Sequence, residues 1–194
     1  MSDKGSERLQ TVDSAVQQVM QVLEMVTNDP GRWNTLTMAG SQYSLTHAER
    51  DGIVWGKDPR ADTEQPARAR QSTMRFRLQV QSHMANPFGT MHGGCIASVI
   101  DLLSSFVLSL YSPGEQGSSW FLTGVSQSLT VHYLAPTQIG TWIEVDAQAL
   151  SVSRNVALVQ TDVYELTSRD GERVRKTATS THTKVDVQTV KSKL

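Results

Sequence analysis

The 194-residue chain has only one cysteine, Cys95. A single cysteine excludes an intramolecular disulfide and the usual zinc sites built from several cysteines. The five histidines are scattered without ligand spacing, so we predict no metal and no cofactor. Neither a G-x-G-x-x-G nor a Walker A sequence occurs, which leaves no common dinucleotide or ATP loop. A formal net charge of −1 gives no general attraction to nucleic acid, and we expect no nucleic-acid partner.

Long uncharged apolar runs are also scarce. Asp3, Glu7 and Asp13 interrupt the N-terminus, and the apolar run of a secretory signal does not follow. The apolar segment 95–111 is short for a membrane span and carries Asp101 among several serines. We therefore predict no stable membrane insertion and a cytoplasmic location, with a mitochondrial one left open.

The apolar pattern predicts both helices and strands. Residues recur at spacings of three and four from Leu9 to Val26, which is typical of an amphipathic helix. A second helix is predicted from about Gly94 to Tyr111. Its apolar residues form one stripe that can pack on the sheet: Ile96, Val99, Ile100, Leu103, Val107 and Leu110. Alternating residues predict strands near 41–47, from 72 onward, and at about 121–134, 142–152, 156–167 and 173–185, with a loop at 56–69. One long helix followed by four strands indicates an α+β fold with an antiparallel sheet.

The segment from Asn86 to Gly94, which reads NPFGTMHGG, precedes the second helix. Backbone N–H groups at a helix start can stabilise an oxyanion, and the pair Gly93-Gly94 stands there. Asp101 is the only charged residue between Gly93 and Gly114, and a lone acid in such a stretch costs desolvation energy unless it is paired or used. Together these groups suggest attack on a carbonyl.

One helix cannot easily bring Gly93 and Asp101 to the same reacting atom. Eight residues span roughly 12 Å at about 1.5 Å per residue, whereas a base and an oxyanion donor must both reach within about 3 Å. The side of the helix that carries Asp101 has small residues, which would let another helix or a ligand approach closely: Ala97, Ser98, Ser105 and Ser109. Two antiparallel helices packed by this side would place Asp101 of one subunit near Gly93 of the other. The sequence thus predicts a site across a dimer interface.

The ordered set Asn-x-x-Gly-x-x-His-Gly-Gly with Asp101 resembles the hotdog-fold acyl-CoA thioesterases, most closely the PaaI and THEM2-like branch. Gly124-Val-Ser126 and the run from Tyr133 to Pro136 strengthen the likeness, which covers about 72–185. The resemblance implies an antiparallel sheet around one long central helix, here with an extra N-terminal helix. It also implies homodimers, which pair into tetramers.

The same resemblance implies hydrolysis of an acyl-CoA substrate, and it assigns roles to residues. Gly93 donates its backbone N–H to the thioester oxygen, and Asp101 of the partner subunit acts as general base or nucleophile. Asn86 holds the thioester or the water, Ser126 assists the water or Asp101, and His92 shapes the loop near the thioester. We therefore predict three parts of the chain: an N-terminal helical extension at 1–32, the hotdog domain at 33–187 and a tail at 188–194.

Alternatives stay open for several residues. Asn86 also suits a plain turn, and Ser126 suits a polar sheet face shared with Ser128, Thr130 and His132. A thiol at a helix start beside a histidine would have a lowered pKa, which makes Cys95 a second candidate nucleophile. The CoA phosphates call for basic groups near the mouth of the site, and the candidates are Arg75, Arg77, Arg154, Lys176 and Lys184. Of these, Arg75, Arg154 and Lys184 are predicted, with Gly94, to bind the substrate; each could also be a solvated charge on a strand face.

Two other functions fit the same residues. One is a non-catalytic hotdog protein that binds acyl-CoA, although binding alone does not need an isolated carboxylate. The other is a hotdog enzyme acting on thioesters of acyl carrier protein or of a polyketide intermediate. The sequence gives no information on acyl-chain length or on aromatic against aliphatic substrates.

Overall fold

The computed structural model describes residues 8–28, 37–38, 43–63, 69 and 71–187. Its main element is an antiparallel sheet in the order β2-β1-β3-β5-β6-β7-β4. The strands are β1 (Ser44–Arg50), β2 (Ile53–Val54), β3 (Ser72–Gln79), β4 (Val125–Tyr133), β5 (Trp142–Val152), β6 (Val156–Leu166) and β7 (Arg173–Val185). The predicted α+β class with an antiparallel sheet is confirmed, and the predicted strands at 142–152 and 173–185 have the observed bounds.

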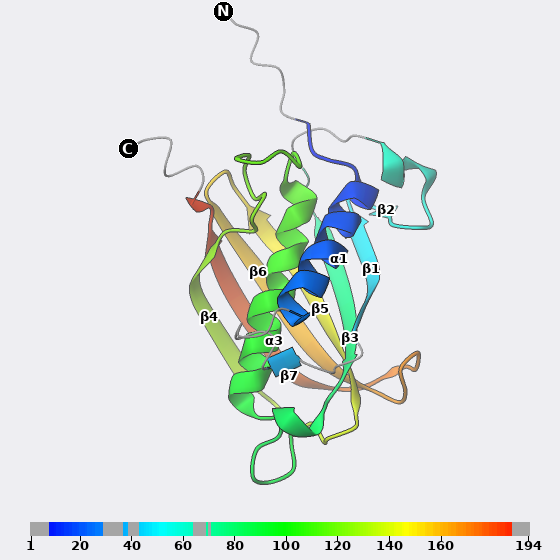
Figure 1. Ribbon diagram of the computed structural model, residues 1–194, viewed down its shortest axis with the longest axis vertical. Coiled ribbons are helices and arrows are strands. Elements are labelled where there is room, and N and C mark those ends of the chain that lie inside the picture. The colour runs from blue at the N-terminus through cyan, green and yellow to red at the C-terminus, as the bar shows by residue number, and fades with distance from the viewer. Residues whose placement is uncertain (1–7, 29–36, 39–42, 64–68, 70, 188–194) are drawn as a thin grey trace, which may run out of the picture.

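The helices α1 (Val12–Asn28) and α3 (Gly93–Ser105) lie side by side on one face of the sheet (Figure 1). The helix α3 continues as the 3-10 helix η3 (Phe106–Tyr111), so the predicted helix is present but its last part is wound more tightly. Two further 3-10 turns are η1 (Pro59–Asp62), inside the predicted 56–69 loop, and η2 (Ser82–Met84). The resulting architecture is the hotdog fold, a sheet around one long central helix.

The apolar stripe of α3 and η3 packs on the sheet, as predicted. Its residues are buried: Ile96, Val99, Ile100, Leu103, Val107 and Leu110. The opposite side was predicted to be open for close approach of another helix, and this is only partly right. Ser105 and Ser109 are buried, because Lys184 of β7 contacts the first and Gln10 contacts the backbone of the second.

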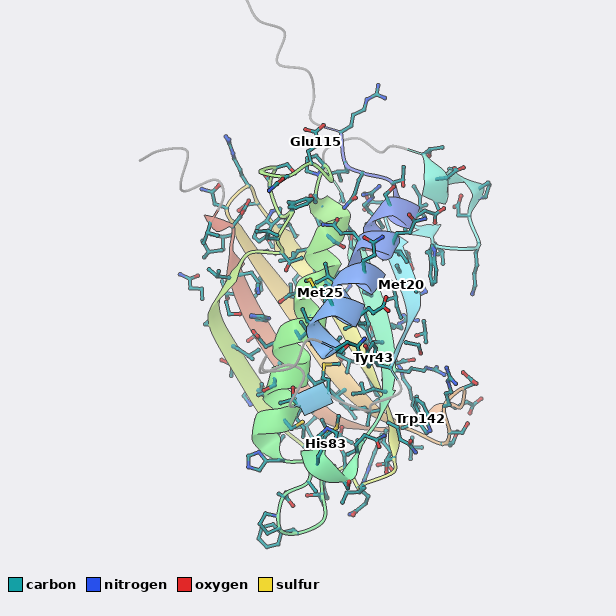
Figure 2. The ribbon with its side chains drawn as sticks, viewed as in Figure 1. Met20, Met25, Tyr43, His83, Glu115 and Trp142 are labelled. Atoms are coloured by element: carbon teal, nitrogen blue, oxygen red, sulfur yellow. The ribbon has the colours of Figure 1, made fainter. Side chains whose placement is uncertain are left out.

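The helix α1 covers the half of the sheet beside α3. Its buried residues join the same hydrophobic core as the sheet, while Met20 and Met25 are half exposed on its outer side (Figure 2). The buried Arg50 guanidinium ties this half together by donating to the carbonyl oxygens of Gln10 (2.8 Å) and Leu110 (2.7 Å). The predicted end of this helix at 28–31, the domain boundary after residue 32 and the 188–194 tail lie outside the described residues, except for Asn28.

The segment Gly93–Tyr111 is apolar and long enough to cross a membrane by length and composition alone. Two thirds of it, however, is buried inside the molecule, where it forms the core beneath the sheet. Its apolar character is therefore accounted for by packing within this chain.

Candidate active site

The start of α3 is fixed by a side-chain cap. The Nδ1 atom of His92 accepts a hydrogen bond from the Gly94 N–H at 2.9 Å and so satisfies one of the free donors of the first turn. A β-carbon at position 94 would lie 3.1 Å from that nitrogen, so a side chain there would press on the cap. His92 thus has the loop-shaping role that the sequence predicted, and a catalytic contact by His92 stays a prediction.

Gly93 is the first residue of α3 and lies beneath an aromatic ring. The Tyr133 hydroxyl donates to the Gly93 carbonyl at 2.9 Å, and a β-carbon at position 93 would meet the ring at 3.3 Å. Glycine therefore lets the tyrosine of β4 close over the helix start. Within the described residues the Gly93 N–H has no hydrogen-bond acceptor, and a helix N-terminus carries partial positive charge. This donor can stabilise an oxyanion.

The side-chain amide of Asn86 forms hydrogen bonds within its own loop. Its Oδ1 atom accepts from the N–H groups of Phe88 (2.9 Å) and Thr90 (3.2 Å), and its Nδ2 donates to the Thr90 hydroxyl at 2.8 Å. This is the turn role that the sequence analysis left open. A contact between Asn86 and a thioester or a water stays a prediction.

Asp101 lies two turns along α3, with its side chain 49% exposed. The Ser126 hydroxyl of β4 donates to its Oδ1 atom at 2.6 Å. Two of the predicted site residues, far apart in sequence, are thus in direct contact. A carboxylate oriented by a hydroxyl and open to solvent can take a proton from water or attack a carbonyl itself.

A β-bulge sets the direction of Ser126. The register of β4 against β7 shifts between Ser126 and Ser128, so that Ser126 lies opposite Lys184 and Leu129 lies opposite His182. Residues directly opposite one another share a face of the sheet, and the bulge therefore turns Ser126 inward with Leu129. The alternative in which Ser126 belongs to one polar face with Ser128 is wrong.

His182 is the site residue that the sequence analysis missed. Its Nε2 lies 2.9 Å from the Ser126 Oγ and 3.3 Å from Asp101 Oδ1, and its Nδ1 lies 2.7 Å from the Ser104 hydroxyl. Because the Ser126 proton points to Asp101, we assign the imidazole hydrogen to Nε2, which donates to Ser126. Burial, and then the charge of Lys184, lower the His182 pKa from 6.5 to about 4, against the opposing effect of Asp101. The ring is neutral at pH 7.

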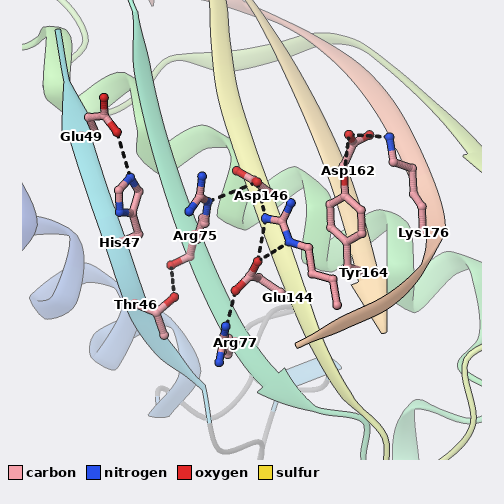
Figure 3. A network of polar contacts seen from close by, with 11 residues as sticks. Thr46, His47, Glu49, Arg75, Arg77, Glu144, Asp146, Asp162, Tyr164 and Lys176 are labelled. Carbon is pink, nitrogen blue, oxygen red and sulfur yellow. Dashed lines mark hydrogen bonds and ion pairs between the residues drawn. The ribbon is translucent and has the colours of Figure 1, made fainter. Parts of the chain in front are cut away.

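The predicted CoA-binding cations are divided between the two faces of the sheet. Lys184 is buried on the inner face, where its Nζ donates to the Ser105 hydroxyl at 2.8 Å; burial lowers its pKa, and Asp101 opposes this. Arg75 lies on the outer face in an ion pair with Asp146, as Figure 3 shows. Arg154 is exposed in the turn between β5 and β6. Lys184, Arg75 and Arg154 thus do not lie together at one site, and their contacts with CoA stay predictions.

The outer face of the sheet, which is the face opposite α3, carries a network of charged side chains (Figure 3). Arg77 and Arg173 both pair with Glu144, at 2.8 and 2.6 Å, and Lys176 pairs with Asp162 at 2.6 Å. The basic groups Arg77 and Lys176, considered above for a phosphate rim, thus have carboxylate partners in this structure.

Cys95 does not have the surroundings of a nucleophile. Its side chain is buried against the Thr37 carbonyl oxygen, 3.7 Å away, and burial raises the thiol pKa to about 11. The alternative prediction of a lowered pKa is wrong, because desolvation disfavours the thiolate. In the part of the chain that the structure describes, no group of three His, Cys, Asp or Glu side chains is placed to hold a metal ion.

Comparison with known proteins connects this geometry to a family. A family model described as the thioesterase superfamily matches residues 88–187, just over half of the chain. Acyl-coenzyme A thioesterase 13 of Mus musculus is 28% identical over 91 residues, or 47% of this chain and 60% of the mouse protein. The match thus spans less than two thirds of that relative.

Solved structures share the fold at lower identity. The zebra fish thioesterase superfamily member 2 is 20% identical, with a TM-score of 0.60 over 88% of this chain and 96% of that one. The E. coli PaaI protein is 13% identical, with a TM-score of 0.55 over 89% of this chain and 95% of that one. The family model and the shared fold agree with the resemblance drawn from the motif. The chain belongs to the thioesterase superfamily.

Proposed function

We propose that this protein is an acyl-CoA thioesterase, which hydrolyses a CoA thioester to a carboxylic acid and free CoA. The observation that carries the proposal is the Asp101 carboxylate, half exposed on α3 and held by Ser126 beside the neutral His182. A carboxylate in this setting can act on water or on a carbonyl without a metal ligand set. The similarity to acyl-coenzyme A thioesterase 13 supports CoA as the carrier.

The reaction requires a second subunit. Gly93 and Asp101 are separated by about 12 Å along one helix, so one copy of α3 cannot place both at the same thioester. In the proposed homodimer, Asp101 and Ser126 of one protomer face the Gly93 N–H of its partner. Pairing of these dimers into tetramers stays a further prediction, which light scattering would test.

The edge of the sheet beside the site supports this assembly. Strand β4 pairs with β7 on one side, and no strand of the described residues pairs with its other side. Apolar side chains are exposed at both ends of this strand: Val125, Tyr133 and, one residue after the strand, Leu134. An unpaired strand rich in exposed apolar residues is suited to pairing with a second copy of itself.

In the proposed reaction the partner's Gly93 N–H stabilises the oxyanion that forms from the thioester carbonyl. Asp101, oriented by the Ser126 hydroxyl, takes a proton from the attacking water and returns it to the departing CoA sulfur. In the second route Asp101 attacks the carbonyl itself, and water then cleaves the resulting anhydride. Water that attacks the Asp101 carbonyl of this anhydride leaves its oxygen in the carboxylate, so ¹⁸O found in Asp101 after a single turnover in ¹⁸O-water identifies the second route.

The test is release of free thiol from a panel of acyl-CoAs by the wild-type protein and by Asp101→Asn and Ser126→Ala. We expect turnover by the wild type and a loss of about 10²-fold or more in kcat for Asp101→Asn. Asp146→Asn, on the outer face of the sheet, is the matched control and should keep full activity. Binding of the panel without turnover by the wild type would contradict the proposal.

A further inference from the structure

Lys184 carries a positive charge in an unusual place. It lies on the inner face of β7 at 4% exposure, together with the buried residues Ser180, His182 and Asp186. Removing an ammonium group from water costs free energy unless strong partners compensate. Lysine is almost never fully buried without such partners, so its position needs a reason.

Its partners are two serine hydroxyls. The Lys184 Nζ donates to Ser105 Oγ at 2.8 Å and to Ser126 Oγ at 3.4 Å. Ser126 in turn donates to the Asp101 Oδ1, and Ser105 donates to the Asp101 backbone oxygen, both at 2.6 Å. A hydroxyl has one proton, so a serine that accepts from the lysine has its own proton free for Asp101. One ammonium group thus sets the direction of two hydroxyls.

The charges around Lys184 fit this arrangement. Asp101 on α3 faces it from one side, and the neutral His182 precedes it on the same face of β7. Asp186, two residues further along, accepts the Trp120 N–H at 3.1 Å. On β4 the facing residue is the uncharged Ser126.

We propose that Lys184 is a positioning residue of the thioester site, which holds the Ser126 and Ser105 protons toward Asp101 and balances the charge of that carboxylate. The inference rests on the proposed function and deepens it. Lys184 acts through the two serines rather than on the substrate. Since burying the ammonium opposes folding, this residue serves the site and not the stability of the fold.

The test compares Lys184→Met, which keeps the length of the side chain and removes its charge, with Arg175→Met, which removes an exposed cation of the same strand. For Lys184→Met we expect kcat to fall about tenfold to hundredfold, as for the loss of a charge-assisted hydrogen bond, with KM within about threefold of wild type. The melting temperature should stay equal or rise. Arg175→Met should keep kcat. An unchanged kcat in Lys184→Met, or a change in KM alone, would overturn the inference, and the second result would indicate a CoA contact instead.

A measurement independent of turnover separates this inference from the proposed function. The His182 ring is titrated by NMR in the wild type and in Lys184→Met. Removing the cation should raise the His182 pKa, because the lysine charge opposes protonation of the ring. If the wild type hydrolyses no acyl-CoA, the proposed function fails, and this titration alone then decides whether Lys184 organises the cluster. An unchanged His182 pKa overturns the inference in either case.

Discussion

The buried His182 makes the stability of this protein depend on pH in a predictable direction. Its pKa is 6.5 in an unfolded chain and about 4 in the folded protein, so the unfolded state binds the proton more readily. The stabilisation is fully present above pH 6.5 and is lost as the pH falls through 4. The difference between the two pKa values corresponds to about 3 kcal/mol, of which about 2 kcal/mol is lost by pH 5.

The perturbation is His182→Gln, which replaces the imidazole by an amide that does not titrate. Urea unfolding is followed by tryptophan fluorescence at pH 7.5, 6 and 5, at one protein concentration because dissociation contributes in an oligomer. Between pH 7.5 and 5 the wild type should lose about 2 kcal/mol more than the variant, whatever stability the variant has at pH 7.5. His132→Gln, at an exposed position of β4, is the matched control and should follow the wild type.

Parallel pH profiles for the wild type and His182→Gln would refute this reasoning. Such a result would mean that the His182 imidazole is solvated or charged in the folded protein. The hydrogen-bond directions assigned around Ser126 would then be wrong, since a charged ring donates from both nitrogens.

Two further predictions concern the scaffold that holds the site. Gly124→Ala should destabilise the fold by about 2 kcal/mol or more, because the residue has a φ of +68° and a β-carbon would lie 2.6 Å from the Val185 carbonyl oxygen. Gly117→Ala is the control: with a φ of +88° and no atom within 4 Å of the β-carbon, it should cost about 1 kcal/mol. Both losses are measured by thermal unfolding, and equal losses would contradict the steric argument. Arg50→Met should lower the free energy of unfolding in urea by about 2 to 4 kcal/mol, because two buried carbonyls lose a charged donor. The control Arg60→Met, at an exposed ion pair, should change it by less than about 1 kcal/mol. Similar values for both variants would refute the anchoring role of Arg50.

Much of the fold could be predicted because its apolar pattern is regular. The stripe on α3 repeats with helical spacing, and β5 alternates cleanly, so the central helix and the later strands were found from residues alone. The first strand was predicted near 41–47 and lies at Ser44–Arg50, where few apolar residues mark its ends. The side of the helix that carries Ser109 was predicted to be open, because nothing in the sequence of α3 and η3 reveals that Gln10 packs there.

The site could be predicted only in part, for a physical reason. Asp101 stands out as a lone acid in an apolar helix, but His182 lies in a strand whose two faces are both polar: Ser180, His182 and Lys184 point inward, and Thr179, Thr181 and Thr183 alternate with them. Without a polarity difference, alternation cannot say which set faces the core. The inward turn of Ser126 depends on a bulge, which is a property of pairing between strands that no local pattern contains.

The most direct test of the proposed site is complementation between two inactive chains. One carries Asp101→Asn, and the other carries Gly93→Val, whose side chain would press on the Tyr133 ring beside the amide. The chains are mixed, unfolded and refolded together, and thiol release is compared with that of each variant alone and of the wild type treated in the same way. A site across the dimer interface predicts recovery of about a quarter of wild-type activity, because half the dimers are mixed and each mixed dimer has one intact site. No recovery in dimers that have formed would contradict a site shared between subunits.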